Sequence, residues 1–162
     1  MMKNLLLTAL VVAALSLVGC KSSTTVSDEY ASVQKFEVVC LGSNHDGTQT
    51  LRSWGKGSSK SDAIENAKRN AVETVIFKGI NSGGDCDKRP LVNQANAREL
   101  YEDYFNAFFK KGGAYAKYVK LDEKRTSRIN ASGTSQEAWG VVLTVDRAAL
   151  KKRLADDNLI DL

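Results

Sequence analysis

His45 and Asp46 are adjacent residues that could perform acid–base chemistry, because an imidazole can exchange a proton near neutral pH and a carboxylate can orient it. A catalytic triad also needs a nucleophile in contact with the base. The chain contains no Gly-x-Ser-x-Gly segment that would present one. In addition, His45 precedes Asp46-Gly47, a pair typical of a hairpin turn. The sequence therefore favours an exposed loop histidine and predicts that the protein is not an enzyme.

Gly55 and Gly57 precede a predicted helix, where backbone N–H groups could bind a phosphate. A dinucleotide-binding fingerprint needs a third glycine, and a phosphate loop needs a Gly-Lys-Ser/Thr ending at fixed spacing. The chain has neither pattern here. We therefore expect these glycines to let a strand and a helix pack closely.

The potential metal ligands are few. The candidates lie near Cys40 or Cys86 in the sequence and are His45, Asp46, Asp85 and Asp87. With a single histidine and no Cys-x-x-Cys spacing, they do not form a recognised metal-binding pattern. The sequence predicts no metal site and no cofactor.

Cys20 follows a segment with the three-part layout of a secretory signal: a positive Lys3, an almost wholly apolar stretch over 5–18, and the small Gly19. The ending Leu17-Val18-Gly19-Cys20 resembles the lipobox of bacterial lipoproteins. That resemblance implies that the Cys20 thiol receives a diacylglycerol and that the chain is cut before it. The alternative is a free cysteine near an ordinary cleavage site.

The lipobox also predicts where the protein is located. Residues 1–19 would be the signal peptide, 20–32 the lipidated cysteine and a flexible tether, and 33–162 a single domain. An apolar stretch that spans a bilayer takes roughly 20 residues, so the lipid at Cys20 is the expected membrane anchor. By the same resemblance, Lys21 in place of aspartate implies the outer membrane. The segment from Lys21 to Thr25 has no acidic cluster, which favours the periplasmic face over the cell surface.

The charge balance is mildly basic. The whole chain has a net charge of +4, and removing the signal takes away only Lys3, leaving 22 basic and 19 acidic side chains, a difference of +3. The basic residues do not form a stripe interleaved with aromatic residues. We therefore expect no nucleic-acid partner.

Cys40 and Cys86 remain as an even pair once Cys20 carries the lipid. In an exported protein such a pair indicates a disulfide. Both cysteines lie beside turn-forming residues, and a bridge between them would stabilise the fold by roughly 3–4 kcal/mol on the chain-entropy model.

The hydrophobic pattern predicts an α+β fold. Strands are expected at 36–41, 48–54, 114–121, 124–129 and 138–145. Helices are expected from Ser61 or Asp62 to Lys78-Gly79, from Asn93 to Lys111, and after a capping Asp146. In the first helix Ala63, Ala67 and Ala71 recur on one face. This order predicts an antiparallel sheet of about four or five strands with helices packed on one face.

The helix expected over 93–111 has a broad aromatic face. Its apolar positions follow helical spacing: Ala97, Leu100, Tyr101, Tyr104, Phe105, Phe108 and Phe109. Such a stripe is typical of a core, but its width also allows a partner surface. The candidate partner-binding residues are Tyr101, Tyr104 and Phe108.

Residues 51–75 combine a strand, Gly-x-Gly and an alanine-faced helix. They resemble the FlgT-like domains of flagellar T-ring proteins and their small outer-membrane lipoprotein relatives, at Gly55, Gly57, Ser59, Ala63, Ala67 and Ala71. The strand and helix over 139–154 follow the same order. The resemblance implies a non-catalytic structural or adaptor subunit with protein partners in the cell envelope. The alternative is a lipoprotein that binds a small ligand or glycan through the loop 81–90 and exposed aromatic residues.

Overall fold

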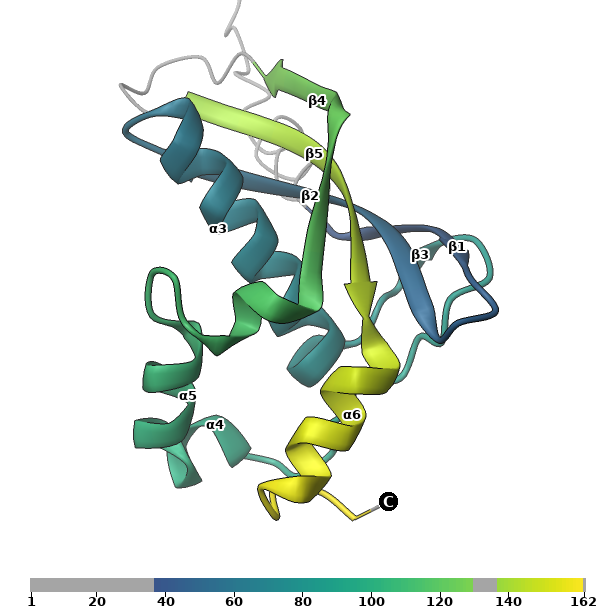
Figure 1. Ribbon diagram of the computed structural model, residues 1–162, viewed down its shortest axis with the longest axis vertical. Coiled ribbons are helices and arrows are strands. Elements are labelled where there is room, and N and C mark those ends of the chain that lie inside the picture. The colour runs from purple at the N-terminus through teal and green to yellow at the C-terminus, as the bar shows by residue number, and fades with distance from the viewer. Residues whose placement is uncertain (1–36, 130–136, 162) are drawn as a thin grey trace, which may run out of the picture. The chain divides into compact units, whose positions relative to one another are not determined.

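The computed structural model describes residues 37–129 and 137–161, which belong to one compact unit extending from Gln34 to Leu162. The predicted lipid attachment at Cys20, the signal 1–19 and the tether 20–32 lie outside the described residues. Within the described part of the chain, the fold is α+β, as the sequence predicts (Figure 1).

The described strands form one five-stranded sheet in the order β3-β1-β2-β5-β4. Their bounds are Val39–Ser43 (β1), Thr48–Gly57 (β2), Ser82–Gly83 (β3), Val119–Ile129 (β4) and Glu137–Asp146 (β5). Neighbouring strands are antiparallel, except that β3 pairs with β1 in parallel. The sheet is thus mixed rather than wholly antiparallel, because the two-residue β3 follows a helix and runs along the outer edge of β1.

The hairpin predicted around His45 is present between β1 and β2. The Asn44 N–H donates to the Thr48 carbonyl over 2.9 Å, and Gly47 has a φ of 82°. That left-handed conformation is one that glycine adopts without strain, which explains Gly47 at the end of the turn.

Helix α3 extends from Lys60 to Glu73 and carries the predicted alanine face. Ala63, Ala67 and Ala71 are fully buried. The helix begins earlier than predicted, because Ser59 rather than Ser61 or Asp62 is the N-cap. The Ser59 side chain accepts a hydrogen bond from the Asp62 N–H over 3.2 Å, the usual bond of a serine cap.

Helix α3 packs across β2 and β5 at very short range (Figure 1). A Cβ atom at Gly55 would collide with the Ala63 carbonyl and the Ala67 amide, and one at Gly57 would collide with the Ala63 amide. The expected packing role of the two glycines is confirmed.

The end of α3 widens into a π-helical turn, η1, from Thr74 to Lys78. The Gly79 N–H therefore bonds to the Thr74 carbonyl, five residues back. The carbonyls of Val75 and Ile76 instead accept from the N–H groups of Leu91 and Val92, at 3.1 and 2.9 Å. The returning loop thus satisfies helix-terminal carbonyls that would otherwise lack partners.

The prediction of one long helix over 93–111 is wrong. The structure has two short helices, α4 from Ala97 to Leu100 and α5 from Glu102 to Phe109. Between them Tyr101 has φ −116° and ψ 39°, which is not helical. This break ends the helical register at Tyr101, although Ala97 of α4 and Phe105 of α5 belong to the same core.

The predicted strands at 114–121 and 124–129 also differ from the structure. Residues Ala114–Tyr118 form a 3-10 helix, η2, that follows Gly113. The rest is the single strand β4, whose pairing with β5 shifts between Asp122 and Thr126. A bulge therefore bends one strand where the polar sequence suggested a second strand.

Helix α6, from Arg147 to Asp156, begins as predicted at Asp146, whose carboxylate accepts from the Ala149 N–H over 2.8 Å. In Figure 1, α4, α5 and α6 gather near one end of the sheet, while α3 lies across it. The structure therefore does not confirm that all helices pack on one face.

Replacing Ala67 by leucine should overpack the contact between α3 and β2. We expect Ala67→Leu to lower the free energy of unfolding by about 1–3 kcal/mol, measured by urea denaturation. The matched control is Ala107→Leu, on the exposed side of α5. Equal stability of Ala67→Leu and the wild type would contradict the packing described here.

Candidate functional site

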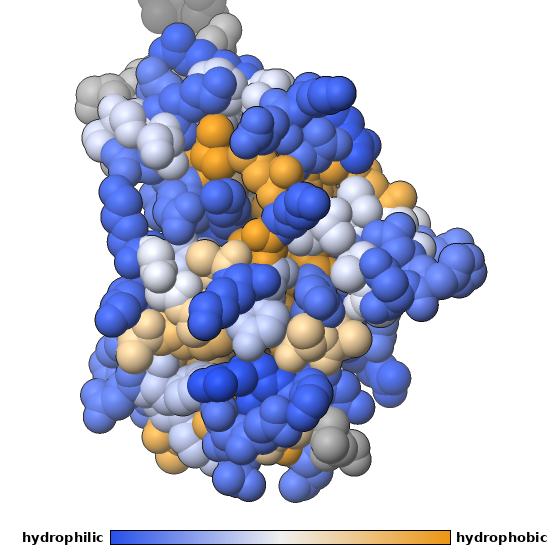
Figure 2. Space-filling view, viewed as in Figure 1, coloured by the Kyte–Doolittle hydropathy of each residue, from blue (hydrophilic) through white to orange (hydrophobic). Residues whose placement is uncertain are grey.

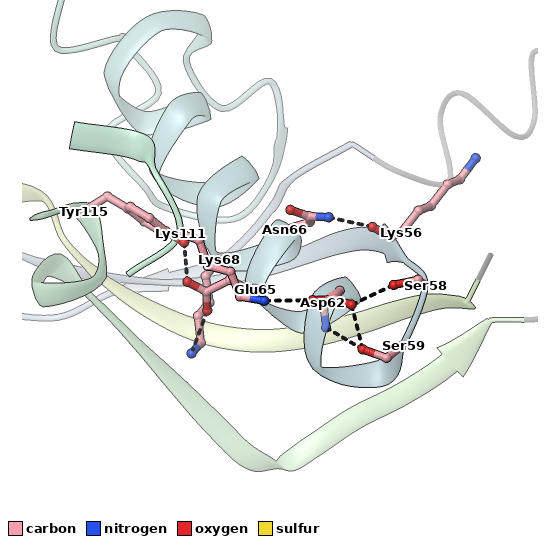
Figure 3. Close-up of polar contacts among 9 residues, drawn as sticks. All are labelled: Lys56, Ser58, Ser59, Asp62, Glu65, Asn66, Lys68, Lys111 and Tyr115. Atoms are coloured by element: carbon pink, nitrogen blue, oxygen red, sulfur yellow. Dashed lines mark hydrogen bonds and ion pairs between the residues drawn. The ribbon is translucent and has the colours of Figure 1, made fainter. Parts of the chain in front are cut away.

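The segment around Gly55-x-Gly57 carries a dense polar network at the start of α3 (Figure 3). The Asp62 carboxylate accepts hydrogen bonds from the hydroxyls of Ser58 and Ser59, each 2.8 Å long. Lys111, from the loop after α5, donates to the same carboxylate over 3.1 Å. Ser58, followed by Ser59 and Lys111, lowers the pKa of Asp62 to about 2.

This network decides what the glycine motif does. The start of a helix favours a nearby negative charge, and here Asp62 of the same chain supplies it. Both glycines are in close contact with the α3 backbone, which leaves no room for a ligand between them. The segment therefore serves as a self-capped junction between strand and helix.

Glu65 and Tyr115 form a second polar contact one turn further along α3 (Figure 3). The Tyr115 hydroxyl donates a short hydrogen bond to Glu65, and Lys68 pairs with the same carboxylate at 3.5 Å. Burial and then the Glu65 carboxylate raise the pKa of Tyr115 to about 12. Because Tyr115 is fully buried, this pair fastens η2 to α3.

His45 and Asp46 lie in the exposed hairpin turn. Asp46 accepts from the N–H and the hydroxyl of Thr48, at 3.0 and 2.7 Å, which lowers its pKa. The carboxylate thus closes the turn, an ordinary role for aspartate there.

Cys40 and Cys86 form the disulfide that their pairing in the sequence indicates. Cys40 is buried in β1, whereas Cys86 is in the loop that follows β3. The bridge joins positions 46 residues apart and fixes this loop to the first strand.

The aromatic candidates for partner binding are mainly part of the core. Phe108 is only 3% exposed, so its assignment to a partner surface is corrected. It stacks between Tyr104 and Tyr118, with ring centroids 5.9 and 6.1 Å away. Tyr101 and Tyr104 are half-buried against the same core.

Tyr104 is also held by its hydroxyl. The group donates to Asp157 at the end of α6 over 2.6 Å, and burial, followed by this bond, raises the pKa of Tyr104 to about 12. Tyr104 therefore links α5 to the C-terminal helix.

The residue that sequence analysis missed in this region is Leu100. It is 62% exposed at the end of α4, although helical spacing placed it on the buried face. The non-helical Tyr101 is the reason, because it ends the register in which Leu100 and Phe108 would share a side. The preceding residues Ala97, Arg98 and Glu99 line a groove of about 490 Å³ that also includes Phe77 and Val92.

A second missed feature lies on the sheet face opposite α3. A hollow of about 430 Å³ there is lined by residues that include Arg52, Trp54, Arg125 and Val142. The sequence alternation in β2 separates Trp54 from Leu51 and Ser53, but it does not say which side α3 covers.

The rest of the described surface gives few further signals. On the face shown in Figure 2, hydrophilic residues predominate and apolar residues show between them in separate patches. In residues 37–129 and 137–161 we find no cluster of three or more potential metal ligands. No helix in these ranges has the length and apolarity needed to cross a membrane.

Asp62 should make stability depend on pH in acid. Because folding lowers its pKa from the ordinary 3.8 to about 2, its ionised form stabilises the fold above that ordinary value. This contribution is lost as the pH falls toward 2. We expect Asp62→Asn to have a lower Tm than the wild type at neutral pH, and the gap to close between about pH 4 and pH 2.

The control for this prediction is Asp103→Asn, an exposed carboxyl on α5 whose side chain makes no hydrogen bond or ion pair with another described residue. A gap in Tm for Asp62→Asn that is constant with pH would show that the network does not depend on the charge of Asp62.

No family model matches this chain, and no curated protein or solved structure is significantly similar to it.

Proposed function

We propose that this protein is a lipid-anchored, non-catalytic envelope protein that acts as a structural or adaptor subunit of an envelope-spanning assembly, of the secretion or flagellar-ring kind. The observation that carries the proposal is the exposed Leu100 at the end of α4, the helix whose preceding residues line the groove. The partner would be a protein subunit of that assembly.

The export part of the proposal has two supports. One is the lipobox-like ending at Cys20. The other is the disulfide between Cys40 and Cys86, which is characteristic of oxidising compartments such as the periplasm. A domain that is anchored at a membrane surface and stabilised by a disulfide suits a protein that holds other subunits of an assembly in place.

The surface at Leu100 has features of an interface. Arg98 is already ordered, because its guanidinium lies 5.3 Å from the Phe109 ring centroid and 3.6 Å from the Glu73 carboxylate. An ordered arginine loses less freedom on binding, and arginine is enriched at interface centres. Leu100 supplies an exposed apolar side chain on the same short helix.

The anchor is tested by replacing its attachment residue. Cys20→Ser should release the protein from membranes into the soluble fraction, and the wild type should incorporate a fatty-acid analogue. An unlabelled wild type that is still bound to membranes would contradict lipid anchoring.

The adaptor surface is tested by photo-crosslinking in intact cells. A photoreactive residue at position 100 should capture a specific envelope subunit, and the same residue at Ala107, exposed on α5, should not. Leu100→Lys should abolish co-purification of that subunit while changing the free energy of unfolding by no more than about 0.5 kcal/mol.

Equal capture from positions 100 and 107 would overturn the assignment of this surface. Co-purification that persists in Leu100→Lys would do the same. Neither result depends on the lipid, so the anchor and the adaptor surface are tested separately.

A second function, the binding of a glycan or another small ligand, is favoured by the hollow around Trp54. An indole and a guanidinium lining one concave site are side chains that ligand sites often use.

A further inference from the structure

We propose that the face of the sheet opposite α3, called here the open face, binds a strand of an acidic polysaccharide. The open face is formed by every second residue of β2 and its partners on β5 and β4. This inference rests on the second proposed function, glycan binding at the hollow around Trp54, and names the class of ligand; it needs neither Leu100 nor a protein partner.

The register places two hollows on the open face. Trp54 pairs with Gly140 and Arg52 with Val142, and these residues line the hollow of about 430 Å³. Further along the same strands, Thr48 pairs with Asp146 and Thr144 with Lys120, and these line a second hollow of about 480 Å³. The Thr50–Thr144 pair continues the face between Arg52 and Thr48. The two hollows therefore follow the strand direction, which suits an elongated ligand.

The indole of Trp54 rests on the sheet. A Cβ atom at Gly140 would be 2.8 Å from Trp54 Nε1 and 3.1 Å from its Cδ1, so the ring lies directly over this glycine. Gly140 thus leaves room for an aromatic platform. The negative face of an aromatic ring attracts the polarised C–H bonds of a sugar ring.

Positive side chains outnumber negative ones in the lining of the two hollows, where Arg52, Arg125, Lys117 and Lys120 face Asp46 and Asp146. Arg125 pairs with Asp122 at 2.6 Å, Asp46 accepts from Thr48, and Asp146 accepts from the Ala149 N–H. By contrast, no ion pair joins Arg52, Lys117 or Lys120 to another described residue. These three cations line the hollows, and guanidinium and ammonium groups bind carboxylates strongly.

An acidic saccharide fits this surface better than a peptide or a bilayer. A peptide could extend the sheet only along the outer edge of β4, because β2 and β5 both have strand partners on their two sides. A surface that binds a bilayer usually presents protruding apolar side chains, whereas the open face has concave sites. A uronic acid chain combines ring faces for Trp54, carboxylates for the cations, and hydroxyls for the threonines.

The test uses the full chain in a non-ionic detergent and two oligosaccharides that differ only in charge. These are a hexamer of β-1,4-linked mannuronic acid and the neutral β-1,4-mannohexaose. In a Trp139→Phe background Trp54 is the sole tryptophan, so its fluorescence reports the site. We expect the acidic hexamer to bind at least about tenfold more tightly than the neutral one.

Variants identify the residues responsible. Arg52→Gln and Lys120→Gln should each weaken binding of the acidic hexamer by about fivefold or more and leave the neutral one unaffected. Both positions are exposed, so the fold should be retained. The matched control, Lys110→Gln, removes one exposed positive charge after α5 and should change nothing.

Three results would overturn the proposal. They are equal binding of the two hexamers, equal losses in Arg52→Gln and Lys110→Gln, and binding only to vesicles of phosphatidylglycerol or to an acidic peptide. Each of them leaves the test of the adaptor surface at Leu100 untouched.

Discussion

The contact between β2 and α3 constrains most of this structure. The helix backbone comes so close to the strand that neither Gly55 nor Gly57 has room for a Cβ atom. Polar groups then bond across the contact: the buried Ser53 hydroxyl donates to the Ala67 carbonyl over 2.8 Å, and Asn66 donates to the Lys56 carbonyl over the same distance. Small residues and directional bonds together fix the helix in one position along the strand, and so decide which sheet face is covered.

The rest of the fold follows from where α3 ends. Its π-helical last turn presents the carbonyls of Val75 and Ile76 to the returning loop. That loop is tied to β1 by Cys86, and Phe77 at the helix end contacts Phe105 edge-on, with centroids 4.7 Å apart. Backbone bonds, the disulfide and the aromatic cluster thus restrain one region of the chain from three directions, which compensates for the shortness of α4 and α5.

The sequence predicts best where one local rule dominates. The four-residue alanine spacing, the Asp146 cap and the cysteine pair each have a single physical meaning, and each prediction agrees with the structure. The break at Tyr101 could not be predicted, because residues 97–109 suit a continuous helix and only tertiary packing ends it. The exposure of Leu100 and the hollow around Trp54 could not be predicted either, because exposure depends on what packs nearby, which no periodicity specifies.

Two surfaces remain after the core is formed, and they use different parts of the chain. Leu100 and Arg98 belong to α4, whereas Trp54 and Arg52 belong to β2. The two sets share no lining residue, so substitutions in one should not alter binding at the other. Because α3 is fixed to the covered face of β2 by its glycine contacts, a ligand on the open face would meet a rigid platform. A rigid sheet face loses little conformational entropy on binding, which suits recognition of a flexible chain whose own ordering is the larger cost.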